Sequence, residues 1–174
     1  MRVVTLAAAL GLVGPAVASN SRSAAGSDFF KKLKVGQAVT LRGGDFGGAR
    51  IRLTLVKVAD PVRSPYYRSR KGTRFVAFQL RYTNVGKQRY QDVPAAQVEL
   101  IDSFGSLYDS TSSLYGRVIQ PWPLLRPDLN HGLTVDPGET RTAWMGWIVP
   151  AKMRLRALRY VLMWGSSGAA WTLG

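Results

Sequence analysis

Apolar and polar side chains alternate most regularly through residues 74–84. Over the eight residues 76–83, one parity is apolar or aromatic throughout and consists of Val76, Phe78, Leu80 and Tyr82. Successive side chains of a strand point to opposite faces, so this period of two predicts a half-buried antiparallel strand. The Asn84-Val85-Gly86-Lys87 sequence that follows is rich in turn-forming residues and predicts the end of the strand.

Shorter runs of β-branched and aromatic residues, separated by Gly, Pro, Asn and Asp, predict further strands. We expect them at residues 39–42, 51–58, 98–101, 107–108, 140–149, 155–164 and 169–173. Residues 28–33 form a mildly helical stretch, and helix is otherwise scarce. Seven or eight short strands with turns between them predict an all-β fold, an antiparallel β-sandwich.

Residues 142–149 are apolar at both parities, so one of the two faces of this predicted strand needs a cover. Residues 109–135 are irregular and contain three prolines, which exclude central strand pairing. We expect this apolar segment to fold over an open end or edge of the sandwich. The alternative is an apolar groove for a ligand or partner. The candidate residues for either role are Tyr115, Trp122 and Trp144.

The first 18 residues have the layout of a secretory signal peptide. A positive Met1-Arg2 start precedes an apolar run over 3–13, and Ala16-Val17-Ala18 supplies small residues before the cleavage point. We expect a polar, flexible leader at 19–28 and one β-sandwich domain at 29–174. No second segment is long enough to span a bilayer, so we expect no transmembrane anchor after cleavage. The predicted location is secreted, periplasmic or within the cell envelope.

Charge and cysteine content narrow the function. The chain carries 24 Lys and Arg against 10 acidic residues, a net charge of +14, and no cysteine. The absence of cysteine excludes disulfides, a thiol nucleophile and a cysteine metal site. The charge favours anionic partners, which outside a cell are phosphate-bearing envelope polymers and acidic lipid headgroups. The alternative is that the charge serves solubility alone.

The basic residues are densest in the loop predicted between two strands at 63–74. Arginine offers forked donors for phosphate or carboxylate, and tyrosine offers a flat stacking surface. Loops on a rigid sandwich often carry binding residues, although a solvated loop would have the same composition. The candidate anion- or partner-binding residues are Arg63, Tyr66, Tyr67, Arg68, Arg70, Lys71 and Arg74.

Catalytic patterns are scarce. His131 is the one histidine, and the few carboxylates mostly occupy turn positions. A phosphate-binding loop, a calcium loop and a nucleophile elbow are all missing from the sequence. We therefore predict no catalytic residues, no metal site and no cofactor. Two alternatives stay open: a secreted hydrolase that uses His131 beside Asp128, and an exported nucleic-acid binder in which the 63–74 loop stacks on bases.

Four sequence motifs occur in an order that resembles a known family. They are a Val-Gly-x-x-Val opening at 35–41, the strand and Asn-x-Gly turn at 74–86, a Leu-x-Asp-x-x-Gly hairpin at 98–105, and the Pro-Gly-Glu turn at 135–140 with Val149-Pro150. This order resembles a family of exported bacterial immunoglobulin-like domains of unknown function, often found on lipoproteins and other envelope proteins. The resemblance spans 35–164 and implies an immunoglobulin-like sandwich without catalytic residues. The chain departs from the family in lacking a lipid-acceptor cysteine and in carrying the 109–135 segment.

Taken together, these features predict a non-enzymatic exported binding or interaction module. Its expected partner is an anionic envelope component or another exported protein.

Overall fold

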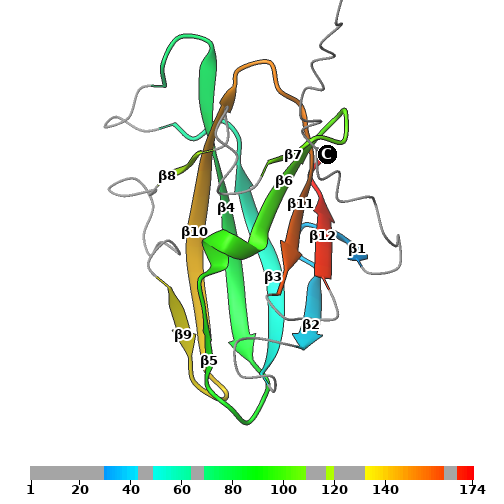
Figure 1. Ribbon diagram of the computed structural model, residues 1–174, viewed down its shortest axis with the longest axis vertical. Coiled ribbons are helices and arrows are strands. Elements are labelled where there is room, and N and C mark those ends of the chain that lie inside the picture. Colours follow the sequence, from blue (N-terminus) through cyan, green and yellow to red (C-terminus); the bar gives the residue numbers. More distant parts are fainter. Residues whose placement is uncertain (1–29, 43–48, 64–68, 109–116, 120–131, 163–167) are drawn as a thin grey trace, which may run out of the picture.

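A computed structural model describes residues 30–42, 49–63, 69–108, 117–119, 132–162 and 168–174 (Figure 1). Strands dominate these residues, with one short 3₁₀ helix, η1 (Pro94–Gln97). The strands are β1 (Phe30–Lys34), β2 (Ala38–Arg42), β3 (Arg50–Ala59), β4 (Thr73–Asn84), β5 (Tyr90–Asp92), β6 (Val98–Asp102), β7 (Leu107–Tyr108), β8 (Arg117–Ile119), β9 (Leu133–Val135), β10 (Thr140–Pro150), β11 (Leu155–Val161) and β12 (Gly168–Thr172).

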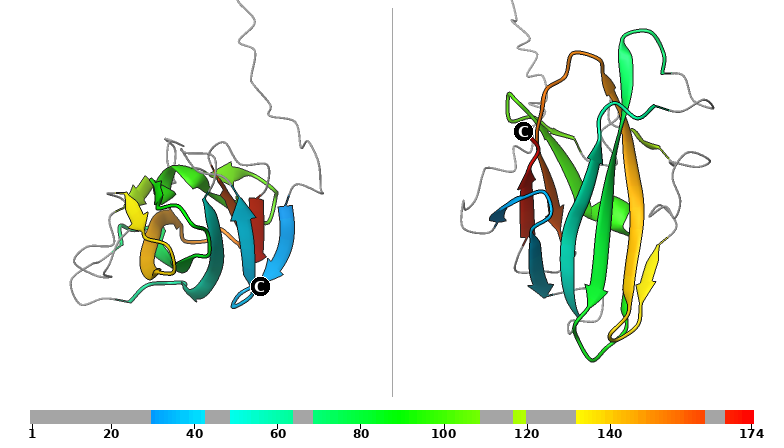
Figure 2. Two further views of the ribbon diagram at one scale, coloured as in Figure 1. Left: turned by 90° about the horizontal axis from the view of Figure 1, so that it is seen from below. Right: turned by 180° about the vertical axis from the view of Figure 1, so that it is seen from behind.

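The strands form two five-stranded sheets and a two-stranded ribbon. One sheet has the order β1-β12-β11-β6-β7, the other has the order β2-β3-β4-β10-β8, and β5 pairs with β9. Figure 2 shows the two larger sheets as separate layers. Their strand pairs are antiparallel except β1 with β12, which is parallel. The predicted immunoglobulin-like β-sandwich is confirmed, with more strands among the described residues than the seven or eight expected.

The core lies between the two sheets. The apolar parity of β4 points inward, as its alternation predicts, and its four side chains are fully buried. They share one cluster with Leu100, Leu158 and Trp171 from the facing sheet. Trp147 of β10 packs edge-on against Phe78, with ring centroids 5.5 Å apart. Burial of these large side chains holds the layers together without any disulfide, at about 1.5–3 kcal/mol for each fully buried aliphatic or Phe side chain.

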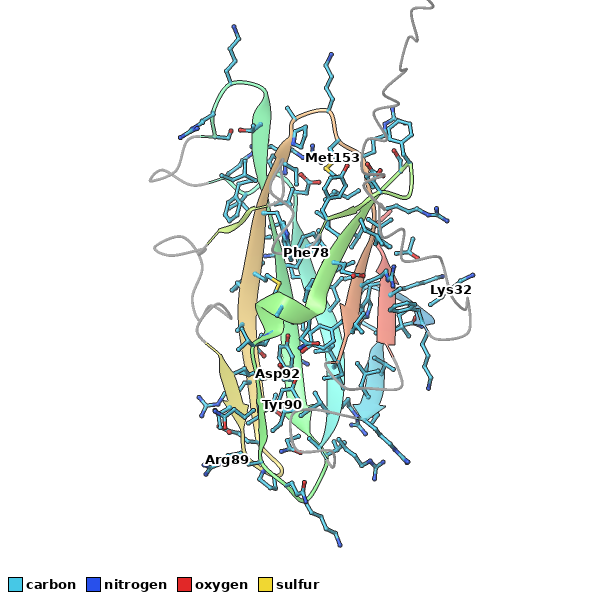
Figure 3. All side chains as sticks on the ribbon, viewed as in Figure 1. Lys32, Phe78, Arg89, Tyr90, Asp92 and Met153 are labelled. Carbon is cyan, nitrogen blue, oxygen red and sulfur yellow. The ribbon has the colours of Figure 1, made fainter. Side chains whose placement is uncertain are left out.

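Polar groups are also buried in the interior, near the β5–β9 ribbon. The Tyr90 hydroxyl donates to Asp92 Oδ2 at 2.7 Å and lies 3.1 Å from the Tyr160 hydroxyl. The centroids of the Tyr82 and Tyr160 rings lie 6.0 Å apart. Figure 3 shows Tyr90 and Asp92 together in this part of the molecule. Burial raises the pKa of all three tyrosines, and in each case neighbouring groups that include Asp92 raise it further.

Residues 30–34 are extended, although a mildly helical stretch was expected at 28–33. Residues 30–34 form β1 and pair with β12, while residues 28 and 29 lie outside the described residues. The Phe30 ring lies against Gly168, and the Arg159 guanidinium sits 3.8 Å from its centroid. A single helical turn has little stability of its own, whereas pairing with β12 satisfies the backbone and partly buries the Phe30 ring. The helical prediction was therefore wrong here.

Three short strands were not anticipated by the sequence. β5, β8 and β9 have three residues each, too few for an alternation to be recognised. β8 and β9 both fall within the 109–135 segment that we expected to be irregular. β8 is an edge strand beside β10, which agrees with the expectation that this segment contributes no central strand.

Candidate anion-binding end of the sandwich

Three turns meet at the end of the sandwich that is uppermost in Figure 1. They precede β4, join β10 to β11, and join β6 to β7. The Ala151 amide donates to the Gly72 carbonyl at 2.9 Å, and the Ser103 amide donates to the Arg154 carbonyl at 2.8 Å. These backbone hydrogen bonds fix the turns relative to one another. Side chains on them therefore occupy one preformed surface.

Four exposed cations project from this surface, which we call the basic end: Arg70, Lys71, Lys152 and Arg154. Arg70 and Lys71 belong to the predicted binding loop and occupy a tight turn, closed by the Thr73 amide donating to the Arg70 carbonyl at 3.0 Å. Arg63 is also exposed, and it follows Val62, whose backbone amide donates to the Phe75 carbonyl. Three further candidates, Tyr66, Tyr67 and Arg68, lie outside the described residues.

Arg74, the last candidate residue of the 63–74 loop, is held by hydrogen bonds within the fold. Its guanidinium bonds both carboxylate oxygens of Asp60, at 2.6 and 3.0 Å. It also donates to the carbonyls of Pro150 and Ala151 at 2.8 Å and of Met153 at 2.6 Å. Figure 3 labels Met153 at this end. Arg74 thus anchors the β10–β11 turn to the start of β4, and any anion bound here would contact the other cations.

Lys152 and Arg154 were missed by sequence reasoning. They lie some 80 positions after the loop, between two predicted strands, where two isolated cations give no motif. The signal that unites them with Lys71 is the pairing of β4 with β10, whose register places Pro150 opposite Thr73. That register was not available from the sequence.

The β6–β7 turn presents an aromatic ring at the basic end. Asp102 Oδ1 accepts hydrogen bonds from the Phe104 and Ser106 amides, both at 2.9 Å, and Oδ2 accepts one from the Tyr108 hydroxyl at 3.0 Å. Gly105 has φ +86, a conformation that glycine adopts without strain. The ordered turn leaves the Phe104 side chain at its tip, 93% exposed.

The hydrogen bonds to Asp102 also control its charge. Burial disfavours its ionised form, but the hydrogen bonds from Ser106, Tyr108, Phe104 and Gly105 outweigh burial and lower its pKa. The carboxylate is therefore ionised at neutral pH, and donors of the turn already satisfy its oxygens. Asp60 pairs with Arg74, and Asp102 is bonded within its own turn. Among the described residues of these turns, no free carboxylate therefore remains to compete with a bound anion for the cations of the basic end.

Trp144 belongs to a second apolar cluster, on the outer face of the β4–β10 pair. It packs with Phe75 and Ala77, and Ala59 and Val62 border them. Trp144 is only 8% exposed, so the outer face of β10 is buried at this position. The other two residues of the predicted cover or groove, Tyr115 and Trp122, lie outside the described residues, and the cover by 109–135 stays a prediction.

The hydrolase hypothesis is not tested by the described residues. His131 lies outside the described residues. In the described ranges, His, Asp and Glu side chains form no group of three that could hold a metal ion. Nor do those ranges contain a helix with the length and apolar character needed to cross a bilayer.

Comparison with solved structures shows the fold. The crystal structure of MPT63, a secreted protein from Mycobacterium tuberculosis, superposes with a TM-score of 0.55 at 15% identity, covering 84% of this chain and all of MPT63. An uncharacterised β-sandwich protein from Clostridium difficile has a TM-score of 0.47 at 13% identity, over 83% of this chain and 95% of its own. The yjhA protein from Bacillus subtilis has a TM-score of 0.42 at 16% identity, over 74% of this chain and 79% of its own.

No protein-family model matches the chain, and no curated protein sequence does either. The resemblance to the exported immunoglobulin-like family therefore stays a prediction, although the sandwich that it implied is confirmed.

Proposed function

We propose that the chain is an exported, non-enzymatic module that docks onto an anionic membrane surface through its basic end. The N-terminal pattern of the sequence supports export, and the structural neighbour MPT63 is described as secreted. The single observation that carries the proposal is the position of Phe104, 93% exposed, on a turn bonded to the backbone of Arg154.

An exposed aromatic ring among cations that form no ion pair with the described residues suits a lipid surface better than a soluble polymer. Each Lys or Arg near an anionic bilayer contributes about 1 kcal/mol. The four cations of the basic end would together contribute about 4 kcal/mol, and burying a phenylalanine side chain adds about 1.5–3 kcal/mol. Such a sum gives reversible attachment with a dissociation constant of roughly 10 to 100 µM. Acidic lipid headgroups are thus the ligand that we assign to this end.

Cosedimentation with lipid vesicles tests this assignment. The protein without its signal peptide should bind vesicles rich in phosphatidylglycerol at low salt and should not bind phosphatidylcholine vesicles. High salt should release it, because salt screens interactions between surface charges. A Lys71→Glu/Lys152→Glu variant should lose most of the binding, and Phe104→Ala should weaken it severalfold. The absence of any retention at low salt would overturn the proposal.

Lys32 offers a matched control for charge alone. It is exposed on β1, along the side of the sandwich rather than at the basic end (Figure 3). Lys32→Glu should keep nearly all of the vesicle binding, and Lys71→Glu alone should lose clearly more. Equal losses in these two variants would mean that net charge, and not the basic end, drives the interaction.

The two other functions suggested by the sequence gain no support from the described residues. A hydrolase would need His131, which is outside them, and a base-stacking surface would need the tyrosines of the 63–74 loop, which are outside them as well.

A further inference from the structure

A second group of cations lies on the outer face of the β2-β3-β4-β10 sheet, toward the end opposite the basic end. We call this surface the arginine face, defined by Arg42, Arg50, Arg52, Lys57 and Arg81. Burial alternates along these strands, with apolar neighbours such as Leu41, Ile51 and Tyr82 in the core. All five cations are exposed and none is assigned to the basic end.

The strand register places these cations next to one another. Arg42 pairs directly with Arg50 across β2 and β3, and Arg52 lies two residues further along β3. Arg81 pairs with Thr54, which makes it a diagonal neighbour of Arg52. Sheet geometry separates directly opposed side chains by about 5 Å, and places side chains two apart along a strand, or diagonally across strands, at about 7 Å. The four arginines therefore form a continuous track.

The track has no internal counter-charge. The ion pairs of the described chain join Arg74 to Asp60, Arg89 to Asp136, Arg141 to Glu139 and Arg159 to Glu99. None of these involves the arginine face, and in the described part of β2, β3, β4 and β10 the outward positions hold no Asp or Glu. Like charges directly opposed across strands cost about 0.2–1 kcal/mol. A bound anion bridging Arg42 and Arg50 would reverse that cost.

Hydroxyl groups fill the spaces between the cations. Arg52 is flanked by its cross-strand partners Thr40 and Thr83, and the Thr83 hydroxyl lies 2.9 Å from that of Thr140. The described outward positions next to Arg42, Arg50 and Arg52 contain no aromatic ring. Trp144 lies diagonally across from Arg81, but it is only 8% exposed and packs in its own cluster with Phe75 and Ala77. A flat surface of guanidinium and hydroxyl groups suits anions and hydroxyls, whereas single-stranded nucleic acid is bound largely by aromatic stacking.

We propose that the arginine face binds a linear phosphate-bearing polymer, whose anionic groups contact arginines that the strands place about 5–8 Å apart. This site is independent of the membrane-docking proposal. Arg81 and Thr73 are eight residues apart on β4, so Arg81 lies roughly 27 Å from the basic end along the strand. A molecule attached to lipid at one end would hold the polymer away from the membrane.

Binding of long-chain inorganic polyphosphate to the processed protein tests the site, because this probe is linear, anionic and free of bases and sugars. The Arg52→Glu/Arg81→Glu variant should bind at least tenfold more weakly. Its plot of log affinity against log salt should also be shallower by about 1.5 to 2, because two phosphate contacts are lost. The control is Lys71→Glu/Lys152→Glu, which changes net charge equally and should lose less than threefold.

Four outcomes would overturn the inference. Equal losses in both double variants would show attraction by net charge alone. Competition by free phosphate as effective, per phosphate, as the polymer would show isolated anion sites. Tighter binding of a single-stranded oligonucleotide of equal charge would assign the face to nucleic acid. No binding of polyphosphate at low salt would remove the site altogether.

The same variants keep this inference separate from the proposed function. Arg52→Glu/Arg81→Glu should still bind anionic vesicles, whereas Lys71→Glu/Lys152→Glu should still bind polyphosphate. The substituted side chains are exposed, so both variants should fold, and a thermal unfolding curve for each checks that they do.

Discussion

Arginine plays opposite parts at the two ends of the β2-β3-β4-β10 sheet. At one end Arg74 is 17% exposed, bonds both oxygens of Asp60 and donates to three carbonyls. On the arginine face, Arg52 is exposed and sits between threonines, with no carboxylate on the outward positions of the described strands around it. The same side chain thus stabilises the fold where partners are preformed and remains open to a ligand where they are not.

This contrast follows from the cost of leaving a partner unsatisfied. Removing Arg74 would take a donor from the Asp60 carboxylate and from the Ala151 and Met153 carbonyls in a partly buried site, whereas the Pro150 carbonyl would keep its hydrogen bond from the Met153 amide. Removing Arg52 would leave nothing unsatisfied, because water already solvates its guanidinium. Stability measurements should therefore separate the two residues clearly.

The largest effect should come from Arg74→Ala, which we expect to lower the free energy of unfolding by about 2–4 kcal/mol. Arg52→Ala should change it by less than about 0.5 kcal/mol. Urea denaturation of both variants measures the difference. If Arg74→Ala proved no more destabilising than Arg52→Ala, the clamp would have no energetic role.

The buried tyrosines extend the comparison to polar groups that are enclosed on all sides. Their raised pKa keeps them neutral in the folded state, whereas unfolded tyrosine ionises near pH 10. The contribution of these tyrosines to stability should therefore be constant below about pH 10 and fall as pH rises further, by about 1.4 kcal/mol per pH unit for each such tyrosine.

Tyr82→Phe sharpens this test. The variant should reduce the slope of stability against pH by about 1.4 kcal/mol per pH unit, since one ionising group of the unfolded state is gone. Denaturation at several alkaline pH values measures the slope, and phenolate absorbance reports which tyrosines titrate before unfolding. A Tyr82 that ionised in the folded protein near pH 10 would contradict the burial argument.

At the basic end, Asp102→Asn should have a moderate effect. The amide keeps the geometry of the side chain but loses its charge and weakens the three acceptor contacts, so we expect a loss of about 1–2 kcal/mol at neutral pH. Because the pKa of Asp102 is lowered, its contribution is present above about pH 4 and disappears as pH falls below that value. The difference between wild type and variant should accordingly shrink in acid; a difference independent of pH would refute the role of the charge.

The smallest effect should come from the arginine face itself. Arg42→Glu replaces a like-charged pair with Arg50 by an opposite-charged pair and should raise stability by roughly 0.5 kcal/mol at low salt. High salt should remove the gain. A loss of stability would show that the two side chains already avoid each other in the folded protein.

The prediction of the main strands from the sequence succeeded where burial on one face imposes a period of two, as in the 78–84 part of β4, or where strong turns delimit a run, as in β6. It failed for β1, β5, β8 and β9. These strands are short, and their pairing depends on partners distant in the sequence. A three-residue strand carries almost no local signal, so its existence is decided by the edge that it meets.

Asn84 shows the same division at a single residue. Its place in an Asn-x-Gly sequence predicted a turn, and its side chain does accept a hydrogen bond from the Gly86 amide at 2.9 Å. Its amide nitrogen, however, donates to the Gln88 and Val135 carbonyls at 2.7 and 2.9 Å, which joins the turn to β9. Local chemistry specified the first contact, and only the packed fold brought the second partner within reach.

The candidate sites divide in the same way. The sequence by itself determined the layered all-β fold, the excess of positive charge and the density of cations in the 63–74 loop, because these depend on local pattern and composition. Only the tertiary structure decided that Arg74 is bound by contacts within the fold and that Lys152, Arg154 and Phe104 lie at the same end as Lys71. It also decided that four arginines from three strands form one track. The physical reason is strand register, which sets neighbours at about 5 Å across a sheet whatever their separation along the chain.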